Sequence, residues 1–424
     1  MPDRISALRK LSQIARAEVE AVAAEGFGPT RPNNTHIHLP PNFSAFDSVA
    51  EAVEMAAAEG LRVLGVSNYY DYTVYDEFAR RAHEAAIFPL FGTEIICLQE
   101  DLVAAKIRIN DPANPGKMYI CGKGISRFAP LSPEAAALLQ VIRDKDSLRM
   151  RQMVERLGEV FIEAGFHAEL DERQVIEMVV RRHGCPFETV YLQERHIAQA
   201  FQERMAERLQ PSEQAAVLRK AYGTEPTAPL DNAVEVQNEI RSRLMKAGKP
   251  GYVPETFVDY GHARQLILAL GGIPCYPVLA DGVVPHCEFE ATPEAVVKRL
   301  REYEVRCAEF IPNRNAPQVL REYVLALRKA GIVVTAGTEH NTRDRIPLTP
   351  ACKGAKPLPE DVAAYFWEGA CVVAAHLWRR SRGESGFVDE GGSPADPSLR
   401  PEERIRRFAA EGRAVIESFA SLAP

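Results

Sequence analysis

Two histidines, His36 and His38, are separated by one residue in the short run THIHL at residues 35–39. In an extended strand, residues two apart point to the same face, so these two imidazoles can share one divalent ion. The pair lies at the end of the first expected strand. In a βα barrel the catalytic groups gather where strands end and loops begin, so the position favours a metal site.

Two later expected strands end in the same triplet, Gly-Thr-Glu. It places Glu94 in FGTEI and Glu339 in AGTEH, where His340 follows directly. In a closed barrel these carboxylates would converge on the mouth that holds His36 and His38. Two imidazoles and two carboxylates suit zinc, manganese or iron, so we expect all four residues to be metal ligands. The alternative is that both acids are ordinary solvated residues at strand ends.

Other polar residues near expected strand ends are candidates for further roles. A planar guanidinium after the strand in EFIPNRN, or the ammonium in CGKGI, could bind a phosphate or a carboxylate, although each could equally be a solvated loop charge. The candidate substrate-binding residues are Arg314, Asn313, Lys123 and Asn68. The candidate catalytic residues are Glu339, His340 and Tyr276, the last on the strand IPCYPV.

These residues need a scaffold, and the chain alternates short apolar runs with helical stretches. Such a βαβ rhythm requires a parallel sheet and predicts an α/β fold. The rhythm stops after residue 125, and residues 126–250 have the pattern of helices. It resumes near Asp259, so we expect one barrel with a large helical insertion. The expected strands are 35–39, 62–68, 88–96, 118–125, 273–279, 305–311 and 332–340.

The same pattern predicts how the chain is divided. The insertion could shield the mouth of the barrel or support a homo-oligomer, and the sequence leaves both open. The segment after residue 380 is rich in Gly, Ser, Pro and acidic residues, which is typical of a flexible segment. The expected parts are an N-terminal helix at 1–27, a barrel at 28–125 and 251–380, the insertion at 126–250, and a flexible segment with a C-terminal helix at 381–424.

Composition restricts the partners and the compartment. The 424 residues are 46% hydrophobic, carry a net charge of −7 and contain no long basic run, which disfavours nucleic acid and anionic membranes as partners. No apolar run is long enough to span a bilayer. The eight cysteines are scattered without a CxxC pair and are expected to be buried, reduced thiols. We therefore expect a cytoplasmic protein.

Five motifs occur in an order that resembles one known family. The runs THIHLP, AAEGLRVLGVSN, FGTEI, LGGIPCYPV and AGTEHN are similar to those of the PHP (polymerase and histidinol phosphatase) family, over about residues 30–125 and 255–380. The resemblance implies a distorted (β/α)7 TIM-like barrel, phosphoesterase activity and up to three metal ions at the strand ends. His36, His38 and Glu94 fall on the family's HxH and GxE positions.

The resemblance is weaker at several other ligand positions. Ser67, Asn68 and Tyr69 stand where the family has Thr-Asp-His, and Tyr276 replaces the histidine of Ala-His-Pro. The closing Ser-Asp-x-His appears as residues 338–341, Thr-Glu-His-Asn, and a further family histidine would fall near Tyr119. A phenol has a pKa of about 10 and binds divalent metals poorly at neutral pH. We therefore expect one ion rather than three.

Three functions are compatible with these residues. The first is a metal-dependent hydrolase, phosphoesterase-like, that acts on a small, anionic phosphorylated metabolite through a metal-activated water. The second is a mononuclear-metal isomerase or lyase of a sugar or sugar acid, in which a tyrosine or glutamate moves a proton. The third is a non-catalytic protein that binds a small molecule on a PHP-like barrel. Fold alone does not choose among them.

Overall fold

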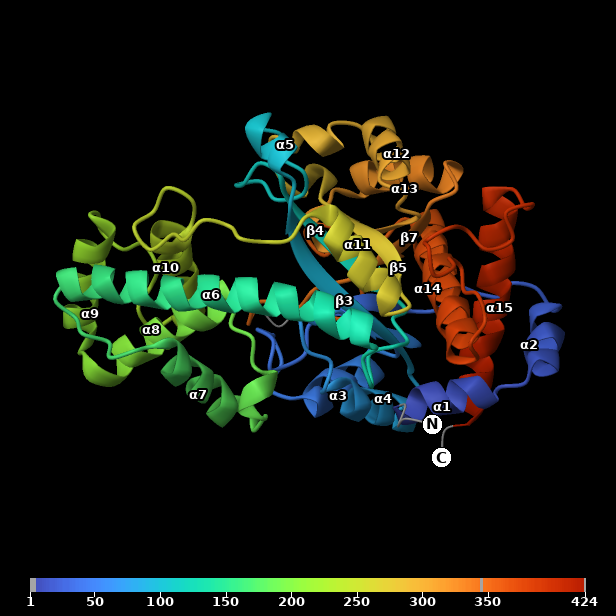
Figure 1. Cartoon of the computed structure of the whole chain (residues 1–424), viewed down its shortest axis with the longest axis horizontal. Helices are drawn as coiled ribbons and strands as arrows, with labels where there is room; N and C mark the ends of the chain where they lie inside the picture. Colours follow the sequence, from blue (N-terminus) through green and yellow to red (C-terminus); the bar gives the residue numbers. More distant parts are fainter. Residues whose placement is uncertain (1–4, 344–345, 423–424) are drawn as a thin grey trace.

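The computed structural model describes residues 5–343 and 346–422. Seven strands form one sheet in chain order, and a bridge between Ile37 and Glu339 brings the two edges together into a nearly closed barrel. The predicted TIM-like barrel with a large helical insertion is therefore confirmed (Figure 1). The strands are β1 (Asn33–Ile37), β2 (Val63–Val66), β3 (Phe88–Leu98), β4 (Lys117–Lys123), β5 (Ile273–Val278), β6 (Cys307–Phe310) and β7 (Val333–Ala336).

Strand β4 departs from the parallel arrangement. The pairs β1–β2, β2–β3, β5–β6 and β6–β7 are parallel, whereas β4 runs antiparallel to both β3 and β5. The chain between β3 and β4 contains only the short helix α5 (Glu100–Ala104). A parallel return needs a crossover of a dozen or more residues, usually a helix that spans the sheet, and α5 is too short for that role. The N-terminal end of β4 therefore lies beside the C-terminal end of β3.

Close approach of the strands depends on glycine at two positions. A Cβ atom on Gly65 of β2 would lie 2.5 Å from the carbonyl oxygen of Thr35, and one on Gly337 would lie 2.3 Å from the Cβ of His36. Real Cβ contacts of this kind do not occur, so both positions require glycine. Both glycines pack against the backbone around His36 and so fix where β1 lies in the barrel.

Helices cover the outside of the barrel with their apolar faces. In α3, for example, the hydroxyl of Ser48 caps the first turn, and Val49, Val53 and Ala56 are buried on the face that the spacing predicts. These helices, with the terminal ones, are α1 (Ser6–Gln13), α2 (Arg16–Ala23), α3 (Val49–Ala58), α4 (Tyr75–Glu84), α11 (Tyr260–Ala269), α12 (Pro293–Glu302), α13 (Pro317–Lys329), α14 (Glu360–Ser381) and α15 (Pro401–Ser421).

The insertion extends to one side of the barrel (Figure 1) and has its own apolar core. Ala135 and Leu139, near the start of α6, pack with the barrel, whereas Leu157 and Phe161 further along pack with the second core. The 31-residue helix α6 therefore joins the two cores. The insertion consists of α6 (Pro133–Glu163), α7 (Glu172–His183), α8 (Glu194–Arg208), α9 (Pro211–Tyr222), α10 (Ala233–Ile240) and the π-helical turn Arg241–Met245.

The first and last helices, α1 and α15, lie in contact with each other (Figure 1). The N-terminal region, expected as one helix, forms the two helices α1 and α2. At the other end α15 packs on α14, and a Cβ on Gly412 would lie 1.7 Å from the carbonyl oxygen of Cys371. The segment between these two helices, rich in Gly and Pro, nevertheless buries Phe387 and Val388.

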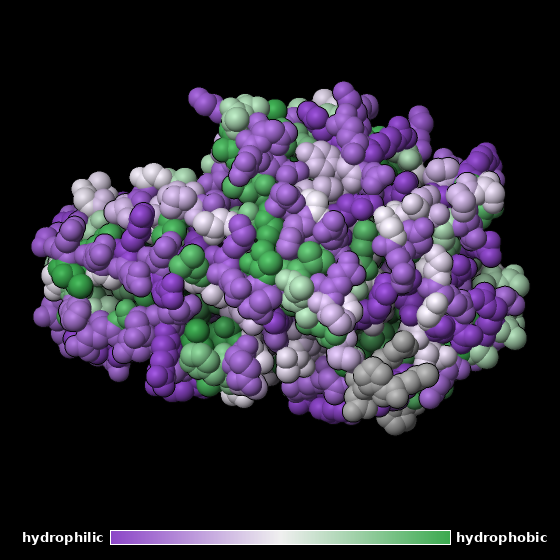
Figure 2. Space-filling model, in the orientation of Figure 1, coloured by the Kyte–Doolittle hydropathy of each residue, from purple (hydrophilic) through white to green (hydrophobic). Residues whose placement is uncertain are grey.

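The surface is mostly hydrophilic on the face shown in Figure 2, with hydrophobic side chains in small groups. Within residues 5–343 and 346–422, no helix combines the length and the hydrophobicity that a membrane span requires. Every cysteine is a free thiol, and all except Cys185 are buried.

Candidate functional site

Three of the four predicted metal ligands lie together at the mouth of the barrel. His36 belongs to β1, His38 follows it directly, and Glu94 belongs to β3. Their side chains are almost fully buried. The Nε2 atoms of the two histidines are 3.4 Å apart, and Oε2 of Glu94 lies 3.1 Å from Nε2 of His38 and 3.5 Å from Nε2 of His36.

This arrangement fits a divalent metal ion. Two corners of a tetrahedron around zinc are about 3.3 Å apart when the metal–ligand distances are about 2.0–2.1 Å. The three observed separations, 3.1, 3.4 and 3.5 Å, bracket that value. In the described part of the chain, Oε2 of Glu94 is buried without a hydrogen-bond partner. A buried carboxylate oxygen that faces two imidazole nitrogens without such a bond is a good ligand for a cation.

Local charges keep Glu94 ionised. Burial alone would raise the pKa of this carboxyl, but the neighbouring imidazoles of His36 and His38 outweigh that effect and lower the pKa well below its usual range. The ring of His38 is oriented by Tyr69, whose ring stacks on it with centroids 5.3 Å apart and planes 3° from parallel. The imidazole is therefore held in place without a hydrogen bond to its Nδ1.

Glu309 of β6 contacts the candidate metal ligand His36 but was not among the residues expected from the sequence. Its Oε2 lies 2.6 Å from Nδ1 of His36, and its Oε1 accepts from Nζ of Lys123 at 2.5 Å and from the hydroxyl of Thr35 at 2.9 Å. Burial opposes ionisation, but Lys123 and His36 lower the pKa of Glu309 to about 2. When Nδ1 of His36 donates to this carboxylate, Nε2 is left with its lone pair toward Glu94. The strand CAEF offered a signal, because an acid stands one residue before its end.

Lys123 belongs to this buried network and not to the cavity. Its ammonium contacts Glu309 and donates to the carbonyl oxygen of Thr35 at 3.0 Å, and its side chain is 3% exposed. The cause is the direction of β4. Because this strand is antiparallel, its first residues reach the mouth, and Lys117 and Tyr119 line the cavity instead.

Glu339 lies in the cavity but is held by other partners. Arg314 donates two hydrogen bonds to its carboxylate, with Nη1 3.0 Å from Oε1, and Asn341 donates to Oε2 at 2.7 Å. The backbone of Glu339 pairs with both histidines, accepting from the amide of His38 at 2.8 Å and donating to the carbonyl of His36 at 2.9 Å. Its φ of +59° belongs to the left-handed region, which turns the chain into the mouth. Glu339 is absent from the cluster of candidate ligand atoms around His36.

Two predicted site residues, His340 and Asn68, form hydrogen bonds with the backbone. Nε2 of His340 donates to the carbonyl of Ile346 at 3.0 Å, and its Nδ1 accepts from the hydroxyl of Thr338 at 2.7 Å. Asn68 bonds with both backbone groups of Leu39, at 2.8 and 2.9 Å. Neither His340 nor Asn68 lines the cavity.

Two more of the predicted site residues, Tyr276 and Asn313, lie away from the metal ligands. The hydroxyl of Tyr276 donates to the buried carboxyl of Glu290 at 2.7 Å, so the side chain is occupied outside the cavity. Asn313 is exposed and also lies outside the cavity lining. Of the seven predicted catalytic and substrate-binding residues, Glu339 and Arg314 line the cavity.

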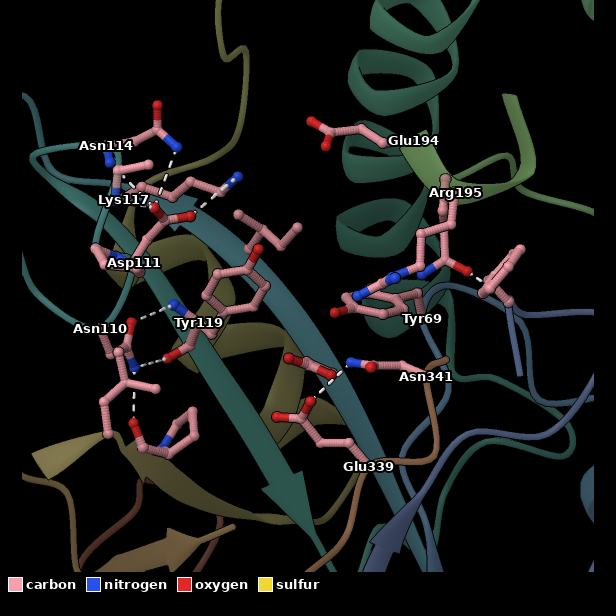
Figure 3. Close-up of a pocket in the computed structure, with 18 of the residues that line it drawn as sticks. Tyr69, Asn110, Asp111, Asn114, Lys117, Tyr119, Glu194, Arg195, Glu339 and Asn341 are labelled. Atoms are coloured by element: carbon pink, nitrogen blue, oxygen red, sulfur yellow. Dashed lines mark hydrogen bonds and ion pairs between the residues drawn. The ribbon is translucent and has the colours of Figure 1, made fainter. Parts of the chain in front are cut away.

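A cavity of about 430 Å³ lies between the barrel mouth and the insertion. This volume suits a small metabolite. The barrel contributes Tyr69, Glu94, Tyr119, Arg314 and Glu339 to its wall (Figure 3). The insertion and the segment that follows it contribute mainly charged side chains, which are Asp146, Arg149, Glu194, Arg195, Arg241 and Lys246.

Most of these charges are paired. Glu194 accepts from Arg149 at 3.2 Å, from Arg241 at 3.3 Å and from Lys246 at 2.5 Å. The surrounding cations lower the pKa of Glu194 well below its usual range, although burial opposes the shift. Arg149 is also paired with Glu255 at 3.3 Å, so these three cations face two carboxylates, which leaves net positive charge on the insertion side of the cavity. None of these residues was expected in the site from the sequence, because they lie on helices far from the barrel motifs.

Comparison with known proteins supports the fold. No protein-family model matches the sequence, and no curated protein matches it. Two solved structures share the architecture. An amidohydrolase from Chromobacterium violaceum, with bound sulfate and no metal, is 17% identical with a TM-score of 0.51, and the alignment covers 79% of this chain and 96% of that one. A candidate metal-dependent phosphoesterase from Bifidobacterium adolescentis is 15% identical with a TM-score of 0.54. That alignment covers 80% of this chain and 96% of the phosphoesterase. The chain therefore shares its barrel fold with these two proteins.

Proposed function

We propose that this protein is a metal-dependent hydrolase of the phosphoesterase type that acts on a small phosphorylated metabolite. The observation that supports this most directly is the convergence of His36, His38 and Glu94 on one point beside the cavity. These residues would hold one ion of zinc, manganese or iron. The names of the two structural neighbours, an amidohydrolase and a metal-dependent phosphoesterase, agree with this chemistry.

A bound divalent ion would polarise a phosphoryl oxygen and lower the pKa of water. The residues of the chain supply the other parts. Glu309 accepts a hydrogen bond from Nδ1–H of His36 and so keeps the lone pair of Nε2 available for a metal. Arg314 can donate to an anionic oxygen of the substrate, and Glu339 beside it can accept the proton of the attacking water. Once Glu339 is protonated, it no longer balances the charge of Arg314, so the guanidinium can neutralise the negative charge on the phosphoryl oxygens.

A mononuclear isomerase or lyase is the second candidate. It is favoured by the ligand set, since three side chains from β1 and β3 suit one ion and Tyr69 stands where the resembled family has a histidine. One ion can polarise a carbonyl while Glu339 moves a proton between carbon atoms. Such an enzyme would act on sugars or sugar acids and release no phosphate.

The test combines metal analysis with a substrate screen. Purified protein is analysed for its metal content and is then incubated with phosphorylated sugars and with sugar acids, while phosphate release and isomer formation are followed. We expect one ion per chain and release of phosphate, both lost in Glu94→Gln. Glu290→Gln is a matched control, because Glu290 is equally buried but bonds to Tyr276 outside the cavity. Isomer formation without phosphate release would support the second candidate, and protein without stoichiometric metal would contradict both.

A further inference from the structure

Among the residues that the structure describes, one cation in the cavity wall has no carboxylate partner. Arg195 is the second residue of α8 and extends toward the barrel mouth, where Tyr69 lies (Figure 3). Its Nη1 donates to the side-chain oxygen of Asn238 at 3.3 Å, and its guanidinium lies 5.9 Å from the centre of the Phe43 ring. Within the described residues no ion pair involves Arg195, although each of the five other basic side chains in the cavity wall has one.

The position of Arg195 is fixed before any ligand binds. The side-chain oxygen of Gln193, two residues earlier, accepts from the backbone amide of Phe43 at 2.7 Å. This bond joins the start of α8 to the loop that follows β1. Arg195 is therefore held at a defined place relative to the metal ligands, which limits the entropy lost when it binds an anion.

The surroundings of Arg195 favour an added negative charge. Burial, followed by repulsion from Arg241, lowers the pKa of Arg195 to about 10 against the weaker attraction of Glu339, so the side chain stays charged at neutral pH. The nearest acid on the helix, Glu194, is already shared by Arg149, Arg241 and Lys246. A guanidinium that has lost much of its water without gaining a carboxylate is stabilised by a bound carboxylate or phosphate.

We propose that Arg195 binds an anionic group of the ligand on the insertion side of the cavity, away from His36, His38 and Glu94. The anionic group is a phosphate or a carboxylate, which the planar guanidinium can grip through two parallel hydrogen bonds. The aromatic side chains of Phe43, Tyr69 and Tyr119 line the space between. As a statement about substrates this rests on the proposed function, but the binding of an anion at Arg195 does not require metal.

The test uses inorganic phosphate as the probe and full-length protein freed of metal with a chelator. Isothermal titration calorimetry gives the dissociation constant of phosphate for the wild type, Arg195→Gln and Arg208→Gln. Arg208 lies at the other end of the same helix and pairs with Glu169 outside the cavity, so it is a matched control. We expect at least tenfold weaker binding in Arg195→Gln and unchanged binding in Arg208→Gln. Equal binding by Arg195→Gln and the wild type would overturn the proposal, as would a wild type that binds no phosphate at millimolar concentration.

A second arm separates this site from the metal centre. His36→Ala/His38→Ala should bind phosphate as the wild type does, even though it no longer holds metal. Loss of phosphate binding in that variant, with binding kept in Arg195→Gln, would place the anion at the metal ligands and overturn the proposal. With a substrate in hand, Arg195→Gln should raise KM about tenfold or more and leave kcat nearly unchanged, because the contact is the same in ground and transition states. The sugar acids and sugar phosphates of the screen then distinguish carboxylate from phosphate at Arg195.

Discussion

The carboxylate of Glu309 lies 2.6 Å from Nδ1 of His36, on the edge of the imidazole opposite to the one that faces Glu94. One ring thus connects a buried carboxylate on β6 to the candidate ligands on β1 and β3. Such a carboxylate fixes the tautomer and the orientation of a metal-binding histidine and raises its basicity. Lys123 balances the charge of Glu309 from β4, so four strands of the barrel contribute to the orientation of His36.

Glu309→Gln tests this relationship. The amide keeps the shape but leaves Lys123 buried without its anion, so we expect metal affinity to fall about 10–100-fold. We also expect the free energy of unfolding to fall by about 3–5 kcal/mol. Metal affinity is measured by competition with a chelator, and stability by denaturant unfolding. Glu290→Gln, at a buried carboxyl outside the cavity, should leave metal affinity unchanged, and equal metal affinity in both variants would remove Glu309 from the site.

His36→Ala/His38→Ala tests the ligands themselves. Glu94 alone rarely holds a borderline transition metal tightly, so stoichiometric metal should be lost. Elemental analysis measures the metal content, and circular dichroism shows whether the variant is folded. His167→Ala is the control, since His167 is exposed and lies outside the cavity that holds the ligands. A double variant with wild-type metal content would exclude the proposed centre.

Asp146, on α6, predicts a dependence of stability on pH. Burial raises the pKa of this carboxyl from 3.8 to about 7, against the opposing effect of Arg149. Below about pH 4 the Asp146 carboxyl is protonated in both the folded and the unfolded chain, so its ionisation does not affect stability. Between about pH 4 and pH 7 the unfolded chain ionises first, and the free energy of unfolding falls as the pH rises. The charged groups that act on Asp146 from the packed elements are Arg149, Glu255, Lys117 and Glu194.

Asp146→Asn should remove this penalty. The variant should gain on the order of 2–4 kcal/mol over the wild type at pH 8 and little at pH 4. Urea unfolding of both proteins at the two pH values measures the difference. Asp144→Asn, two residues earlier on the same helix and on its exposed side, should show no such change between the two pH values. If Asp146→Asn changed the free energy of unfolding equally at both pH values, ionisation of Asp146 would not be what destabilises the wild type.

The sequence predicted the parts of the site that depend on local spacing. His36 and His38 share a face because strand residues alternate, and Glu94 stood out through the Gly-Thr-Glu triplet near an expected strand end, so these three could be identified without a structure. Lys123 was placed by the assumption that every strand of the barrel ends at the mouth. Because β4 is antiparallel, Lys123 lies beneath the mouth and pairs with Glu309 instead. Strand direction depends on the length of the connection before it, which the alternation of apolar residues does not report.

The residues on the insertion could not be predicted for a different reason. Arg195 reaches the cavity only because α6 carries the insertion to one side and α8 returns toward the loop after β1. Nothing in the helical periodicity of residues 126–250 encodes that packing. Arg195 and Glu194 are adjacent in the sequence and have opposite surroundings: in the described part of the chain Arg195 has no ion pair, whereas Glu194 pairs with three cations. Only the tertiary structure distinguishes an unpaired charge from a paired one.

Glu339→Gln tests whether Glu339, after the last strand, takes part in the reaction or only holds Arg314 in place. The amide keeps the shape and a carbonyl oxygen that Arg314 can still contact, but it removes the charge and the basic lone pair. If Glu339 accepts a proton during turnover, kcat should fall about 100-fold or more. If the residue only holds Arg314 in place, the loss should be small and should appear mainly in KM. Metal content should stay at the wild-type level in either case, because Glu339 lies outside the cluster of His36, His38 and Glu94.

Glu368→Gln removes a comparable ion pair with Arg328, away from the cavity, and should have wild-type kcat. Wild-type turnover in Glu339→Gln, with the substrate found in the screen, would show that this acid takes no part in the reaction.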